Sequence, residues 1–151
     1  MSTDQIEKSV VLEAPRAEVW RALSDVKSFG EWFGVELDRS FAPGARVRGK
    51  VTLKGYENLP FEFTIERMEP QRFLSFQWHP FAINPQIDYS AEPTTLVVFE
   101  LEDVPEGTRL RIRESGFDAI PVSRRREAYE ANDKGWTMQM ESIQRFLRKA
   151  A

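Results

Sequence analysis

The sequence predicts an α+β fold in which a curved antiparallel sheet of six or seven strands wraps around a long carboxyl-terminal helix, with two short helices after the first strand. Several segments between residues 46 and 114 alternate apolar and polar side chains, as half-buried strands do. Most turns between them are short, which favours antiparallel pairing. The segment 123–148 instead carries apolar side chains at helical spacing.

The first forty residues predict a strand, two helices and a short strand. Residues 5–13 alternate loosely and precede Pro15, which suits a first helical turn because its missing N–H has no helical partner there. Apolar side chains then recur at helical spacing over 19–26. The segment 29–34 predicts a second short helix closed by its last glycine, and 35–37 a brief strand.

A strict alternation from Arg46 to Lys54 predicts the next strand and places Leu53 on its buried face. The alternation continues in segments 59–66, 74–78, 94–102 and 109–114. Residues 80–93 contain three prolines and no clear period, which predicts a long connection of the kind that is often functional.

The last helix should begin near Ser123, a good capping residue, and end near Arg148. Its apolar stripe consists of Tyr129, Trp136, Met140, Ile143 and Leu147. Gly135 interrupts this helix, where glycine is about 1 kcal/mol less favourable than alanine. A glycine beside the bulky Trp136 indicates close approach or open space, and such a space would form a pocket.

Length and composition predict one domain over residues 1–151. A net charge of -3 disfavours a nucleic-acid surface built on bulk positive charge. The sequence has no apolar signal core and no run near the ~20 apolar residues of a membrane span. We therefore expect a soluble cytoplasmic protein with no membrane insertion and no nucleic-acid partner.

The chemistry-bearing motifs that a sequence can show are missing. With no cysteine, disulfides, thiolate catalysis and cysteine-held zinc or iron–sulfur sites are excluded. The sequence contains no P-loop, G-x-G-x-x-G, G-x-S-x-G or H-E-x-x-H motif, and no plausible metal-ligand cluster. We expect no metal and no cofactor, assign no catalytic residue, and expect binding rather than catalysis.

Seven segments, in this order, are typical of one superfamily. They are Val11–Pro15 with Val19–Leu23, Trp32–Gly34, Leu74–Trp78, Thr108–Leu110, Glu114–Phe117 and Gly135-Trp136. With them the chain resembles the START-like, helix-grip superfamily often called SRPBCC, and within it the bacterial single-domain type of the family of the activator of heat-shock protein 90 ATPase. The resemblance covers nearly the whole chain. It implies a sheet curled around the last helix and, in many members, a hydrophobic ligand cavity between them.

Function does not follow from this resemblance alone, because similar folds serve lipid carriers, hormone receptors, polyketide cyclases and co-chaperones. Eukaryotic activators of the chaperone carry an additional amino-terminal domain for which these 151 residues leave no room. The expectation of a chaperone role in the stress response is weakened accordingly.

The candidate ligand-binding residues are mainly aromatic and face the space expected between sheet and helix: Phe63, Phe76, Trp78, Phe99, Trp136 and Met140, with Trp32 and Phe33 at the entrance. Such walls suit a flat or greasy ligand. An aromatic stripe is more often packed core than pocket, and the family resemblance favours the pocket. The structural role of Trp32 and Phe33 would be to cap the core.

Three polar residues complete the candidates. Glu114 shares the buried face of its strand with Leu110 and Ile112, where it would orient a ligand or act as an acid or base. The preferred interpretation is that it lies at the strand end and meets solvent or an arginine, since buried carboxylates are rare without partners. His79, the only histidine, is expected to point outward, and Tyr89 either closes over the cavity or is exposed.

Basic side chains form rows on two strands and at the start of the last helix: Arg46, Arg48 and Lys50; Arg109, Arg111 and Arg113; and Arg124, Arg125 and Arg126. An acidic partner would dock there, although such rows usually serve solvation and edge protection. We predict binding of a small hydrophobic or aromatic ligand. The alternatives are a protein-interaction module that binds the chaperone or another protein, and a cyclase or hydrolase using Glu114 or Tyr89.

Overall fold

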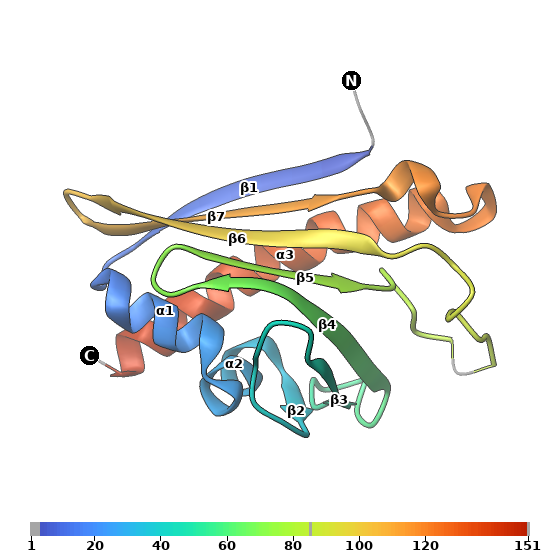
Figure 1. The fold of residues 1–151 in the computed structure, drawn as a ribbon, viewed down its shortest axis with the longest axis horizontal. Helices are drawn as coiled ribbons and strands as arrows, with labels where there is room; N and C mark the ends of the chain where they lie inside the picture. The colour runs from blue at the N-terminus through green and yellow to red at the C-terminus, as the bar shows by residue number, and fades with distance from the viewer. Residues whose placement is uncertain (1–3, 85, 151) are drawn as a thin grey trace.

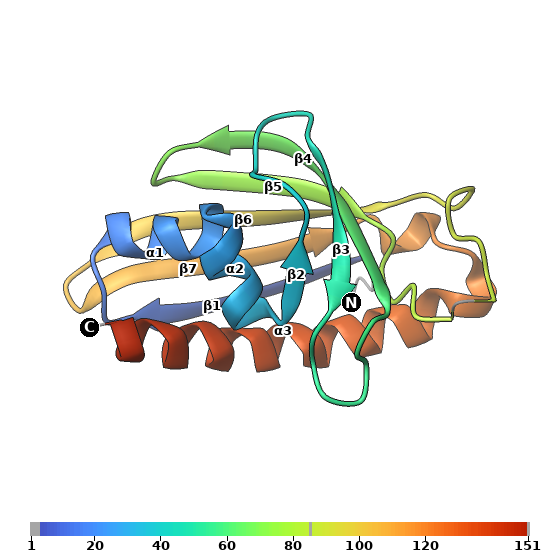
Figure 2. The ribbon, with the colours of Figure 1, turned by 90° about the horizontal axis from the view of Figure 1, so that it is seen from below.

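The computed structural model describes residues 4–84 and 86–150 of the chain. Seven strands form one antiparallel sheet in the order β1-β7-β6-β5-β4-β3-β2, which curves over one side of the long helix α3 (Figures 1 and 2). The strands are β1 (Gln5–Leu12), β2 (Val35–Leu37), β3 (Arg46–Val51), β4 (Pro60–Glu69), β5 (Phe73–Trp78), β6 (Thr95–Val104) and β7 (Gly107–Ser115). The predicted fold class is confirmed.

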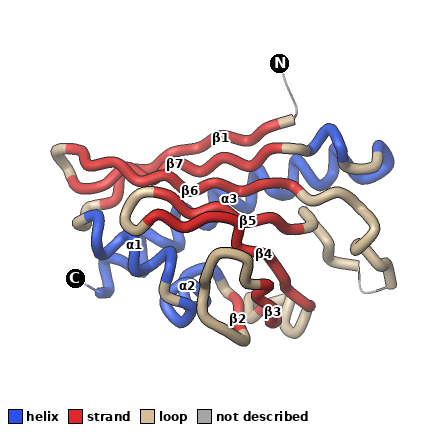
Figure 3. Tube along the Cα trace, in the orientation of Figure 1, coloured by secondary structure: helices blue, strands red, loops and turns tan. Residues whose placement is uncertain are grey.

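The helices are α1 (Arg16–Ser24), α2 (Val26–Phe33), the 3-10 turn η1 (Phe117–Ala119) and α3 (Val122–Ala150). Figure 3 separates the helices from the strands by colour, with α1 and α2 beside the carboxyl-terminal part of α3. The turn η1 precedes the amino-terminal end of α3. The two short helices therefore cover one end of the space between the sheet and α3 (Figure 2).

Local chemistry fixes both ends of α2. The Asp25 carboxylate accepts hydrogen bonds from the backbone N–H of Ser28 at 2.9 Å and from its hydroxyl at 2.8 Å. These bonds hold the pKa of Asp25 below its usual value. Gly34 ends the helix with a left-handed φ of 91°, which glycine adopts without strain. The predicted glycine stop is confirmed, and the cap explains why α2 begins at Val26 rather than Phe29.

Three further boundary predictions are wrong. β3 ends at Val51 rather than Lys54, so Leu53 lies in the turn that follows the strand, where it is 36% exposed and its side chain lies over Gly34. α3 begins at Val122, so Ser123 lies within its first turn instead of capping it. Pro15 precedes α1 as its capping residue rather than lying in the first turn. The turn η1 was not predicted, since three residues show no period.

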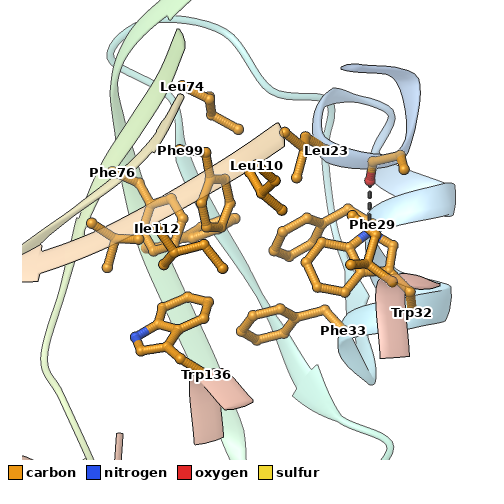
Figure 4. Packing of buried hydrophobic residues seen from close by; sticks show 14 of the residues in the cluster. Leu23, Phe29, Trp32, Phe33, Leu74, Phe76, Phe99, Leu110, Ile112 and Trp136 are labelled. Carbon is orange, nitrogen blue, oxygen red and sulfur yellow. Dashed lines mark hydrogen bonds between the residues drawn. The ribbon is translucent and has the colours of Figure 1, made fainter. Parts of the chain in front are cut away.

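Aromatic side chains fill most of the space between the sheet and the helices. Phe29, Phe63, Phe76 and Phe99 are essentially unexposed, and the rings of Phe63 and Phe76 lie 4.5 Å apart between centroids. Figure 4 shows Trp136 approaching this cluster from α3. Most of the predicted aromatic stripe is therefore packed core, and any cavity must lie at its margin.

Candidate functional site

A small cavity lies where the end of α2, the end of β5 and the middle of α3 meet. Its volume is about 80 Å³, and its walls are Phe33, Trp78, Asn132, Gly135, Trp136 and Gln139. A Cβ atom added to Gly135 would meet no atom within 4 Å. Of the two explanations offered for a glycine at this position, open space is therefore the one the structure supports.

Two indole rings form the main apolar wall of the cavity. Trp78 and Trp136 lie nearly parallel, with ring centroids 5.7 Å apart and an interplanar angle of 26°. Phe33 meets Trp136 edge-on at 6.1 Å (Figure 4). Trp136 is only 2% exposed, whereas Trp78 is half-buried. The cavity thus has rigid aromatic walls and an edge that reaches solvent.

Glu114 lies behind these two indoles and is fully buried. Its Oε1 accepts hydrogen bonds from Trp136 Nε1 at 2.8 Å and Asn132 Nδ2 at 3.0 Å. Its Oε2 accepts from Trp78 Nε1 at 2.8 Å and Thr95 Oγ1 at 2.5 Å, with Asn132 Nδ2 also at 3.1 Å. The interpretation that Glu114 meets solvent or an arginine is wrong, because neutral donors surround it instead.

The register of the sheet and the helix spacing bring these donors together. Trp78 and Thr95 are directly opposed across β5 and β6, while Glu114 on β7 is opposed to Val97. Thr95 lies two residues from Val97, on the same sheet face as Glu114. Asn132 and Trp136 are four residues apart, so they share one face of α3. None of the ion pairs recorded among the described residues involves Glu114.

Gln139 closes the cavity on the side of α2. It is 6% exposed, and its Nε2 donates a hydrogen bond to the Phe33 carbonyl oxygen at 2.8 Å. The other amide atom, Oε1, is buried without a hydrogen-bond partner among the described residues. A buried acceptor left in this state is unusual in folded proteins.

The predicted site residues divide into three groups. Phe33, Trp78 and Trp136 line the cavity, and Glu114 contacts it through the two indoles. Phe63, Phe76 and Phe99 are packed core, Met140 packs against that core, and Trp32 is tied to the Ala22 carbonyl by a 2.7 Å hydrogen bond, drawn dashed in Figure 4. Tyr89 lies in the loop between β5 and β6, under the Arg124 guanidinium at 4.7 Å.

Sequence reasoning missed Asn132, Gln139 and Thr95. A signal for the two helix residues was present, because Asn132, Trp136 and Gln139 are spaced by four and three positions and so share a face. His79 is half-buried, with Nε2 placed 3.0 Å from the Glu92 carbonyl oxygen in the same loop. It does not contribute to the cavity walls.

Many of the basic side chains on the sheet have acidic partners within the chain. Arg46 and Arg48 both contact Glu62, while Arg109 contacts Glu102 and Arg113 contacts Glu100. Partial burial alone would raise the pKa of Glu62, but the hydrogen bonds from its two arginines hold that pKa below its usual value. These rows thus consist largely of mixed charge.

Residues 4–84 and 86–150 contain neither a candidate metal-ion cluster nor a candidate membrane-spanning helix. No group of three or more histidine, aspartate or glutamate side chains in these ranges is placed to hold a metal ion. No helix in these ranges is both long enough and apolar enough to cross a membrane.

The curved sheet around α3, with the short helices at one end, defines a START-like helix-grip protein. A profile of the family described as "Activator of Hsp90 ATPase homolog 1-like protein" matches residues 13–148, and the chain belongs to this family. The resemblance stated from the sequence is thereby confirmed. No curated protein matches the chain.

Solved structures show the same fold at low sequence identity. A protein from Mesorhizobium loti, MLL2253, is 24% identical with a TM-score of 0.76, over 97% of this chain and 98% of that one. A protein from Arthrobacter aurescens has a TM-score of 0.79 at 15% identity, over 97% and 87%. DynU16, a protein of the dynemicin biosynthetic locus, is 24% identical with a TM-score of 0.75 over 97% of this chain. This chain spans 48% of DynU16.

Proposed function

We propose that the protein binds a small, largely apolar or aromatic molecule by one end, in the cavity beside Gly135. The observation that carries this proposal is a helix-interior glycine whose missing side chain faces open space next to two stacked indoles. Glycine is about 1 kcal/mol less favourable than alanine at such a position. No packing constraint at Gly135 accounts for it, whereas a bound molecule does.

The volume of the cavity limits what enters it. Pockets that enclose a whole drug-sized ligand measure roughly 300–1,000 Å³, and an engineered cavity of about 150 Å³ holds benzene. The cavity here measures about 80 Å³. It therefore admits an end group, while the body of the molecule lies at the mouth against half-buried Trp78.

The surroundings of Glu114 favour binding over catalysis. A general acid or base must lie within hydrogen-bond reach, about 2.6–3.2 Å between heavy atoms, of the group whose proton it transfers. Both carboxylate oxygens of Glu114 already accept hydrogen bonds from protein side chains. Glu114 therefore serves to hold Trp78 and Trp136 in position. The fold is also consistent with a polyketide cyclase-like role, in keeping with the locus of DynU16, but the filled carboxylate argues against Glu114 as its acid or base.

The protein-interaction alternative has less support. A depression of about 180 Å³ lies on the outer sheet face, lined by Glu100, Leu101, Glu102, Arg109 and Arg111. Its charges are of both signs and are partly paired within the chain. It therefore does not present the uniform charge that would attract an acidic partner.

The binding proposal is tested with toluene as the probe and the indole N–H signals of Trp78 and Trp136 as reporters in ¹H–¹⁵N NMR. Toluene should shift both signals saturably and leave Trp32 unchanged. Gly135→Leu should fill the cavity and abolish the shift, and Gly135→Ala, which occupies part of the same space, should weaken it while stabilising α3 by up to about 1 kcal/mol. Native mass spectrometry after non-denaturing purification, followed by solvent extraction, would identify a retained molecule. Equal toluene binding by the Leu variant and the wild type would exclude this cavity.

A further inference from the structure

From the polar atoms of the cavity we infer that the ligand group entering it is a hydroxyl or an amine. This group donates a hydrogen bond to Gln139 Oε1, and the cavity discriminates against carboxylates. This inference rests on the proposed function of the same site. It adds the chemical class of the ligand.

The orientation of the Gln139 amide is fixed by its neighbour. The Phe33 carbonyl oxygen lies 2.8 Å from Nε2 and requires an N–H donor, so exchanging the two amide atoms would set two acceptors against each other. Oε1 is therefore the free atom, and it is buried without a partner among the described residues. The cavity that Gln139 lines measures about 80 Å³, well above the roughly 10–15 Å³ that one water needs.

Most side-chain N–H groups around the cavity are already engaged. Those of Trp78, Trp136 and Asn132 donate to Glu114, and one of the two N–H groups of Gln139 donates to Phe33. A ligand carboxylate entering the cavity would therefore meet the Gln139 acceptor and, behind the indoles, the Glu114 carboxylate, and only the second N–H of Gln139, on the same amide as that acceptor, is left to receive it. An entering hydroxyl or amine meets a free acceptor instead.

The test uses four probes that share a phenyl ring and differ in one substituent: toluene, benzyl alcohol, benzylamine and benzoate. Dissociation constants come from the indole shifts of Trp78 and Trp136. Benzyl alcohol and benzylamine should each bind roughly 2- to 10-fold more tightly than toluene, the range of one net hydrogen bond, and benzoate should bind more weakly than toluene. A stronger response to benzylamine than to benzyl alcohol would identify the donor as cationic, and the reverse order as neutral.

Gln139→Met keeps the size of the side chain and removes the acceptor. In this variant the preference for benzyl alcohol over toluene should fall to about one, while Gln144→Met, on the same helix but outside the cavity, should keep the wild-type ratio. If Gln139→Met does not fold, the wild-type probe series still decides. Toluene binding as tightly as both donors, or benzoate binding tightest, would overturn the inference alone. Absence of binding by all four probes would overturn the proposed function as well.

Discussion

Removing the buried carboxylate of Glu114 should destabilise the protein far more than removing an exposed one. In Glu114→Ala the indole N–H of Trp136, which is 2% exposed, loses its acceptor and cannot turn toward solvent. The N–H of half-buried Trp78 loses its acceptor too. Each buried donor left unpaired costs about 1–3 kcal/mol, and the deleted side chain leaves a void that adds to this.

One effect opposes this loss. Removing a buried charge relieves its desolvation, which amounts to several kcal/mol per ion in proteins. Here four side chains donate to the carboxylate and compensate most of that penalty. We therefore expect a net loss of about 3 kcal/mol in the free energy of unfolding, and a smaller loss for Glu114→Gln, which keeps one acceptor oxygen.

Urea unfolding followed by tryptophan fluorescence measures this loss. Glu100→Ala is the matched control, because Glu100 pairs with Arg113 on the sheet surface, where both side chains are 40% exposed. Such pairs contribute about 1 kcal/mol or less. In the Glu114 variants the indole signals of Trp78 and Trp136 should move while that of Trp32, bound to a backbone carbonyl, stays. A loss of stability in Glu114→Ala no larger than in Glu100→Ala would contradict this expectation.

Three further substitutions test the fold around the site. Gly49→Ala should cost about 1–3 kcal/mol in urea unfolding, since its Cβ would overlap the Glu36 carbonyl oxygen, and an unchanged midpoint would contradict this. Arg124→Met removes hydrogen bonds to two carbonyl oxygens of the loop between β5 and β6. Limited proteolysis should therefore cut this loop faster in Arg124→Met than in Arg126→Met, and equal cleavage rates would show that Arg124 does not hold the loop. Asp25→Ala should lower the free energy of unfolding by about 1 kcal/mol at pH 7. Because the pKa of Asp25 is lowered in the folded protein, its contribution to stability is present above the ordinary value of 3.8 and is lost as the pH falls through the lower folded value. A stability difference between variant and wild type that does not change with pH would refute this.

The strands and helices were predictable because each buries one face, so period alone identifies them. The alternation over β4 to β7 and the stripe on α3 are examples. The ends of strands and helices were less predictable, because they depend on single contacts. Leu53 continues the apolar–polar alternation of β3, but the chain turns after Val51. The spacing of apolar residues does not indicate where such a turn begins.

The position of the site was predictable from the sequence, but the hydrogen-bond partners within it were not. Gly135 beside Trp136 located the cavity, and strand parity placed Glu114 on the buried face. From the sequence, the preferred interpretation was that this carboxylate lies at the strand end and meets solvent or an arginine, because buried carboxylates are rare without partners. The actual partners are neutral N–H and O–H groups of Trp78, Thr95, Asn132 and Trp136. Only the folded sheet brings the first two of these residues within hydrogen-bond distance of Glu114 on β7.

The arrangement of these donors also links the long loop to the cavity. Trp78 immediately precedes the loop segment 79–94 and Thr95 immediately follows it, and both donate to the same oxygen of Glu114. Trp136 of α3 donates to the other oxygen. One carboxylate therefore holds both ends of the loop against the helix, and with them the two indoles that form the cavity wall.

In this arrangement Glu114 positions the two indoles, whereas Gln139 recognises the donor group of the ligand. The variant Glu114→Gln tests whether these two roles are separate. The variant retains Gln139, so the preference for benzyl alcohol over toluene should persist. Both probes should bind more weakly, because the indoles lose part of their restraint. The disadvantage of benzoate relative to toluene should shrink, because the buried charge behind the wall is gone. If the alcohol preference vanished in Glu114→Gln, the carboxylate rather than Gln139 would be the group that selects the donor.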